Sequence, residues 1–129
     1  MKNLQRSLAI SLAVIAVLYA SACAYMWATQ MQQVFEPSAV LQTTPERMGM
    51  KYDALRIPVG SGADQGELDA WWVPADVHAA DAPTVLYFHG NYRNIGNNLE
   101  HTQRLHNLGY NVLLTDYRGY GKSTGGKPS

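Results

Sequence analysis

The chain has one cysteine, Cys23, and no cluster of basic residues, and both shortages narrow what it can do. A single cysteine excludes an internal disulfide and a zinc site built from cysteine pairs. Ten acidic side chains balance the ten basic ones, so the positive patch typical of nucleic-acid-binding proteins is missing. His101 and His106 are five residues apart on one predicted helix, hence on different faces, and do not form a metal pair. We expect no metal, no other cofactor and no nucleic-acid partner.

Charged residues are also missing from residues 8–28, which form one uncharged run. As a helix this run would be about 31 Å long, against a membrane hydrocarbon core of about 30 Å. Lys2 and Arg6 precede the run, and the next basic residue is Arg47. This charge bias predicts a cytoplasmic N-terminus and an exported remainder, periplasmic or extracellular in a bacterium. We therefore predict a membrane anchor or signal segment over residues 1–28.

Three interpretations of this segment remain open. It is an uncleaved anchor through residues 8–28, or a signal peptide cleaved after Ala20-Ser21-Ala22, or a lipoprotein signal in which Cys23 is acylated. The apolar residues that continue to position 28 favour the uncleaved anchor, because a signal peptide needs a shorter apolar stretch. All three interpretations export the rest of the chain.

Residues 29–50 contain two prolines and no clean period, which predicts a polar connector before a domain over residues 51–129. The domain begins with two alternating runs that flank a glycine-rich turn at residues 60–66. Alternation of apolar and polar residues is typical of half-exposed strands, so the two runs predict a β-hairpin. The apolar positions are Leu55, Ile57 and Val59 in the first run, and Leu68, Ala70 and Trp72 in the second.

A strand, a helix and a second strand follow the hairpin. Residues 84–88 and 111–115 are mostly apolar without alternation, which predicts parallel strands buried on both faces. Between them one apolar stripe recurs every three or four residues, at Ile95, Leu99, Thr102, Leu105 and Leu108. Asn94 is the expected N-cap of this helix and Gly109 its C′ residue. The predicted fold class is α/β, with a hairpin and one βαβ unit behind an N-terminal hydrophobic helix.

The two loops of that unit carry a family resemblance. His89-Gly90-Asn91 follows the first strand, and Asp116-Tyr117-Arg118-Gly119-Tyr120-Gly121-Lys122-Ser123 follows the second. Their order and spacing resemble the α/β-hydrolase superfamily, and most of all its membrane-associated serine hydrolases, over residues 35–129. The resemblance implies the N-terminal half of that fold. It also implies an exported enzyme that cleaves a small ester, thioester or amide through an acyl-enzyme.

The same resemblance assigns roles to the loop residues. The backbone N–H groups of Asn91 and Tyr92 are the expected donors to the oxyanion of the tetrahedral intermediate. His89 and Gly90 would shape that loop, with Gly90 allowing a tight turn. A plainer interpretation is that Asn91 only tightens a turn. In the second loop we expect a structural turn in which Asp116 accepts hydrogen bonds from the residues after it; its members are Asp116, Arg118, Gly119, Gly121 and Ser123.

The sequence matches Gly-x-Ser-x-Gly once, at Gly121-Lys122-Ser123-Thr124-Gly125, but this is a glycine-rich loop without the strand-turn-helix elbow that a nucleophile motif needs, so Ser123 is interpreted as a turn residue. In the family the nucleophile motif, the acid and the base follow later strands, so we expect residues 1–129 to be inactive alone. We also expect them to fold poorly, because residues 84–88 would expose an unpaired apolar edge. A non-catalytic binding protein on the same fold is the alternative. A nucleotide site is not expected at Gly121-Lys122-Ser123, because a phosphate-binding loop needs glycine at the position of Asp116.

Overall fold

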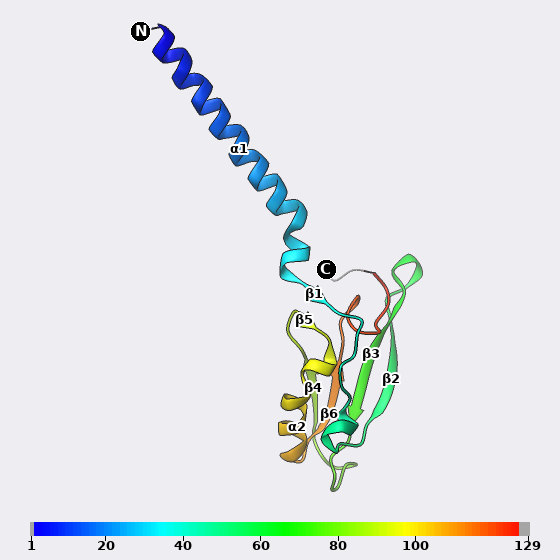
Figure 1. The fold of residues 1–129 in the computed structure, drawn as a ribbon. Helices are drawn as coiled ribbons and strands as arrows, with labels where there is room; N and C mark the ends of the chain where they lie inside the picture. The colour runs from blue at the N-terminus through cyan, green and yellow to red at the C-terminus, as the bar shows by residue number, and fades with distance from the viewer. Residues whose placement is uncertain (1, 127–129) are drawn as a thin grey trace. The chain divides into compact units, whose positions relative to one another are not determined.

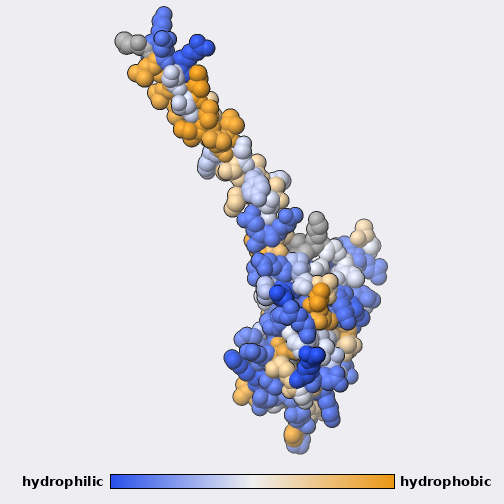
Figure 2. Space-filling model, viewed as in Figure 1, coloured by the Kyte–Doolittle hydropathy of each residue, from blue (hydrophilic) through white to orange (hydrophobic). Residues whose placement is uncertain are grey.

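The structure is a computed structural model that describes residues 2–126, and it divides into two compact units between Val34 and Phe35. The first unit is the helix α1 (Lys2–Val34; Figure 1), and none of its residues is buried. Among the described residues it alone is long and apolar enough to cross a membrane. Hydrophobic side chains cover much of its N-terminal half (Figure 2).

α1 continues six residues beyond the predicted anchor. Residues 29–34 contain neither glycine nor proline, so nothing in them stops a helix. The Thr29 hydroxyl donates to the Tyr25 carbonyl at 2.8 Å and accepts from the Gln33 amide at 2.5 Å. Each of these side-chain bonds joins residues four apart, on adjacent turns of the helix. Cys23 lies exposed on this helix as a free cysteine, and its acylation stays a prediction.

The second unit is built on one four-stranded sheet in the order β2-β3-β6-β4. β2 and β3 form an antiparallel hairpin, β3 pairs antiparallel with β6, and β6 pairs parallel with β4. The chain crosses from β4 to β6 through the helix α2, so the predicted hairpin and βαβ unit are confirmed (Figure 1). The bounds are β2 Asp53–Val59, β3 Gly66–Val73, β4 Thr84–Phe88, α2 Leu99–Asn107 and β6 Asn111–Thr115.

The two parallel strands differ in burial. β6 is central and buries Val112 and Leu114 completely, as predicted. β4 lies at the sheet edge, as expected for residues 84–88, with Leu86 and Phe88 52% and 55% exposed. The burial on both faces that its apolar run predicted is therefore wrong. The ring of Tyr87, on the other face, stacks on His101 of α2. α2 therefore covers one face of β4, while the face of Leu86 and Phe88 stays open within residues 2–126.

The predicted helix over residues 95–108 divides into a 3₁₀ turn, η3 (Ile95–Asn97), and α2. Asn94 caps the 3₁₀ turn by accepting the Gly96 N–H at 3.0 Å, and Gly109 has the expected left-handed backbone with φ of 88°. Leu99, Thr102 and His106 follow one another at three or four residues and share the buried face of α2, whereas Leu108, the C-cap, is nine residues from Leu99 and so lies half a turn away from that face. Leu108, predicted in the apolar stripe, is 73% exposed, whereas His106 is buried.

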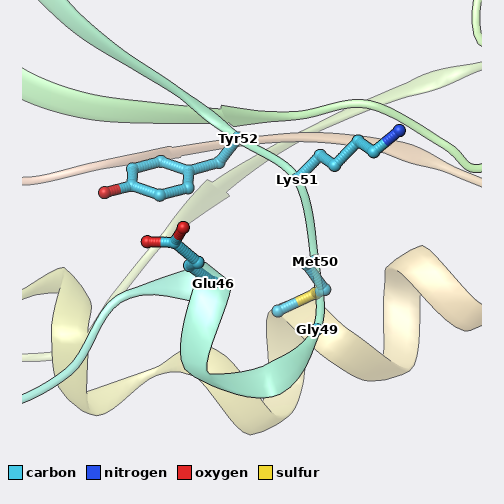
Figure 3. Close-up of a pocket in the computed structure, with 5 residues that line it drawn as sticks. All are labelled: Glu46, Gly49, Met50, Lys51 and Tyr52. Carbon is cyan, nitrogen blue, oxygen red and sulfur yellow. The ribbon is translucent and has the colours of Figure 1, made fainter.

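The core extends into the segment predicted as a connector. One cluster joins Trp71, Ile95, Leu99 and Leu114; the other joins Met50, Val73 and Val112. The 3₁₀ turn η1 (Pro45–Met48) packs beside α2, where the Gln103 amide donates to the Met48 carbonyl at 3.2 Å. An open hollow beside η1 is lined by Glu46, Gly49, Met50, Lys51 and Tyr52, with the Lys51 side chain turned away from Glu46 and Tyr52 (Figure 3).

Candidate functional site

Two loops leave the sheet side by side. β4 and β6 are parallel and end in register, with Phe88 opposite Thr115. Because adjacent parallel strands end at the same edge, the loop over residues 89–94 meets the loop over residues 116–121. This edge is where open α/β sheets place their ligands.

A buried histidine–aspartate pair joins the two loops. His89 Nε2 lies 2.9 Å from Asp116 Oδ1, and both side chains are fully buried. The same oxygen accepts the Ile95 N–H at 3.0 Å, at the start of η3. Asp116 was predicted to accept from the turn that follows it; its partners here lie in the other loop, about 20 residues away, because β4 and β6 are neighbours. The carboxylate thus ties the start and the end of the first loop to the second.

Two tyrosines of the second loop reach the backbone of the first. The Tyr117 hydroxyl donates to the His89 carbonyl at 2.7 Å, and the Tyr120 hydroxyl donates to the Asn91 carbonyl at 2.9 Å. Their rings enclose the His89 imidazole, with centroids 4.8 Å and 5.3 Å from it. Burial is the main cause that raises the pKa of both phenols, so both hydroxyls are donors at neutral pH. Neither contact was predicted, although the sequence places both tyrosines in one glycine-rich loop.

The first loop also pairs with the segment after α1. β5 (Tyr92–Arg93) runs parallel to β1 (Glu36–Pro37), and the Glu36 N–H donates to the Asn91 carbonyl at 3.0 Å. In a trans peptide the C=O and the following N–H point in opposite directions. The Asn91 carbonyl faces β1, so the Tyr92 N–H is directed away from it. The Tyr92 N–H is one of the two predicted oxyanion donors. Its direction follows from the contact between β1 and the carbonyl of the same peptide.

Arg93 has an unusual backbone. Its φ is 59°, in the left-handed region that a residue with a side chain seldom adopts. Its Nε donates to the Tyr92 hydroxyl at 2.6 Å, and the guanidinium lies 5.0 Å from the centre of the Tyr92 ring. The Tyr92 and Arg93 side chains are therefore in direct contact on this loop.

The glycines of the two loops differ. Gly119 and Gly121 have φ of 74° and 53°, as turn glycines do. A Cβ on Gly121 would overlap the Asp116 carboxylate. Gly90 lacks a left-handed φ, and a Cβ there would meet nothing within 4 Å. The tight turn expected at Gly90 therefore does not explain why this residue is glycine. The role of Gly90 in the mechanism stays a prediction, and it depends on the space that the missing side chain leaves for a substrate.

Asn94 has a larger role than the predicted cap. Its side chain is completely buried, and its amide nitrogen donates to the carbonyls of Ser38 and Val40 at 2.8 Å and 2.9 Å. Together with the bond from the Gly96 N–H, these contacts fasten residues 38–40 beneath the first loop. A sequence shows an asparagine at a helix start but not which distant carbonyls its amide will meet.

The remaining predicted turn residues lie farther from the first loop. Arg118 donates to the Asp64 carboxylate at 2.6 Å, and this contact lowers the pKa of Asp64. The Ser123 hydroxyl accepts the Asp69 N–H at 2.8 Å and so binds β3. Residues 2–126 bring together no group of three acidic, histidine or cysteine side chains that could hold a metal ion.

The strand order, the parallel β4–α2–β6 unit and the two loops at one sheet edge define an α/β-hydrolase fold. The protein bem46 of Schizosaccharomyces pombe is 35% identical over 83 residues, 64% of this chain and 27% of that protein. The lysophosphatidylserine lipase ABHD12 of Rattus norvegicus is 40% identical over 63 residues, 47% of this chain and 15% of the lipase.

Among solved structures, the esterase Pf2001 of Pyrococcus furiosus matches 74% of this chain and 35% of its own, with 27% identity and a TM-score of 0.57. No family model matches the chain. The chain belongs to the α/β-hydrolase superfamily. It spans well under half the length of these relatives.

Proposed function

We propose that this chain provides the oxyanion loop of a membrane-anchored serine hydrolase. The observation that carries the proposal is the Tyr92 N–H, directed away from β1 in a loop held by the buried His89–Asp116 pair. Fixed backbone donors stabilise an oxyanion best when they need no reorganisation during the reaction. In this fold one such donor comes from the loop after the third strand of the sheet, and β4 corresponds to that strand.

In the proposed mechanism a serine attacks the substrate carbonyl and forms an acyl-enzyme, which water then hydrolyses. The Tyr92 N–H donates to the oxyanion in both steps. In this proposal the nucleophile, its base and its acid lie downstream of residue 129, as the resemblance to the family implies. His89 is not the base, because its imidazole is enclosed by Tyr117, Tyr120 and Asp116.

An ester is the favoured substrate. The two relatives with named activities are a lipase and an esterase, and both names denote cleavage of carboxylic esters. The apolar α1 would hold the enzyme at a membrane, where an ester with an acyl chain resides. The bias of Lys2 and Arg6 supports a cytoplasmic N-terminus and an exported hydrolase domain.

The test uses the complete protein. It should react with a fluorophosphonate at one serine in a Gly-x-Ser-x-Gly motif downstream of residue 129, and it should hydrolyse activated esters. Residues 1–129 expressed alone should do neither. Absence of labelling and turnover in a folded complete protein would instead support the non-catalytic binding protein.

The orientation and the anchor need separate measurements. A reporter that is active only after export, fused after residue 126, should be active; activity of a cytoplasm-only reporter would contradict the orientation. If α1 is the anchor, Cys23→Ser should change the mass only by the substitution of oxygen for sulfur and should leave the membrane retention unchanged. A loss of lipid mass in that variant would identify a lipoprotein.

A further inference from the structure

We infer that Tyr120, with Tyr117 beside it, is a positioning residue that sets the direction of the oxyanion-loop N–H groups. This inference builds on the proposed function, because it explains how the Tyr92 N–H is held. The second loop then has a part in the reaction beyond that of a structural turn.

The first step concerns the Asn91 carbonyl. It accepts two hydrogen bonds, one from the Glu36 N–H at 3.0 Å and one from the Tyr120 hydroxyl at 2.9 Å. A carbonyl oxygen has two lone pairs, so both acceptor positions are filled. Two donors from different segments fix the plane of the Asn91–Tyr92 peptide, and with it the direction of the Tyr92 N–H.

The second step concerns another peptide of the same loop, two peptides earlier. The Tyr117 hydroxyl holds the His89 carbonyl at 2.7 Å, so the plane of the His89–Gly90 peptide is held in the same way. Two alternate peptides of the loop are therefore each held by a phenol from the other loop. An oxyanion donor must keep its direction before the charge forms, because otherwise the reaction has to reorganise it.

The third step concerns the phenols themselves. Tyr120 is 1% exposed, and its ring packs against His89 and Tyr117 with centroids 5.3 Å and 5.8 Å away. The buried His89–Asp116 pair lies behind these rings. A hydroxyl on a ring that cannot turn keeps its partner's position better than one on a mobile surface side chain.

The main variant is Tyr120→Phe in the complete protein, with Tyr110→Phe as the control. Tyr110 follows α2, and its backbone N–H donates to the Leu105 carbonyl. Within residues 2–126 its hydroxyl makes no hydrogen bond, so the control removes none. Each variant is measured as kcat per active site titrated with fluorophosphonate, as KM, and as hydrogen exchange of a peptide covering residues 89–94.

Tyr120→Phe should lower kcat about threefold to tenfold, the effect of one neutral hydrogen bond, and leave KM within about twofold. Exchange of the loop amides should rise by a similar factor, and Tyr110→Phe should change neither quantity. A phenol that served only the fold would reduce the number of titrated sites without changing kcat per site. Unchanged kcat per site together with unchanged exchange would refute the inference.

Two further outcomes are separable. If wild-type protein shows no labelling and no turnover, the proposed function fails, and loop exchange alone then decides whether Tyr120 holds the peptide. If Tyr120→Phe does not fold, Tyr117→Phe replaces it, because Tyr117 is 37% exposed and its hydroxyl binds the His89 carbonyl of the same loop. That variant should give the same split between kcat and KM, and an unchanged kcat would again refute the inference.

Discussion

Gly121 is the position where one added methyl group should disturb the candidate site most. Its φ is 53°, and a Cβ there would overlap Oδ2 of Asp116. The left-handed backbone alone costs an alanine about 1–2 kcal/mol. The Asp116 carboxylate has no room to move, because it is fully buried and bound to His89 and to the Ile95 N–H. Displacing it would leave buried polar groups without partners, at about 1–3 kcal/mol each.

We therefore expect Gly121→Ala to lower the free energy of unfolding by about 4 kcal/mol. Gly109→Ala is the matched control: its φ is 88° and a Cβ there meets nothing within 4 Å, so only the backbone cost of about 1–2 kcal/mol applies. Urea denaturation of both variants, followed by tryptophan fluorescence in detergent, gives the two values. Equal losses would show that the Asp116 carboxylate moves aside freely, and would refute the idea that it rigidly joins the two loops.

Three further predictions concern single side chains. Asn94→Ala should lower the free energy of unfolding by about 3 kcal/mol and raise amide exchange in residues 89–94, because it removes three hydrogen bonds of a buried side chain. Asn111→Ala also removes three, bound to Ala75, Ala79 and Ala82, and should cost as much without changing exchange in that loop. Gly90→Val should lower kcat of the complete enzyme about 10²-fold at unchanged melting temperature, since its Cβ meets no protein atom; full activity would remove this loop from the mechanism. Asp69 has a pKa raised mainly by burial, so its stabilising effect is present below its ordinary value of 3.8 and is lost as pH rises through the raised pKa. Asp69→Asn should thus gain urea resistance relative to wild type as the pH rises above 3.8, and a difference that does not change with pH would contradict this.

Local sequence patterns predicted where the strands lie, but they did not predict which neighbouring elements cover each strand. The alternating runs around residues 60–66 identified the hairpin, because each strand has one face toward the core. The apolar run of β4 resembled that of β6, although β4 lies at the edge and exposes Leu86 and Phe88. Whether a strand is covered depends on which elements lie beside it. A run of five residues contains no information about those neighbours.

For the candidate site, too, the positions of the loops were predicted from the sequence, but the contacts between them were not. Strand ends and glycines indicated where the two loops are, since these follow from the βαβ pattern. The partners of Asp116 and Asn94 did not follow, because they depend on contacts across 21 and 56 residues of sequence. The tyrosine hydroxyls were missed for the same reason: a donor is visible in a sequence, but its acceptor is decided by the packing of the sheet.

β1 has a consequence for the order of folding. It is two residues long, and the segment after it is held by an asparagine 56 residues further along the chain. Closing so long a loop costs entropy that only a few hydrogen bonds repay, unless the sheet has already brought the ends together. β1 should therefore dock last and detach first. On mild heating, ester hydrolysis by the complete enzyme should decline while the far-ultraviolet circular dichroism of the sheet is still unchanged.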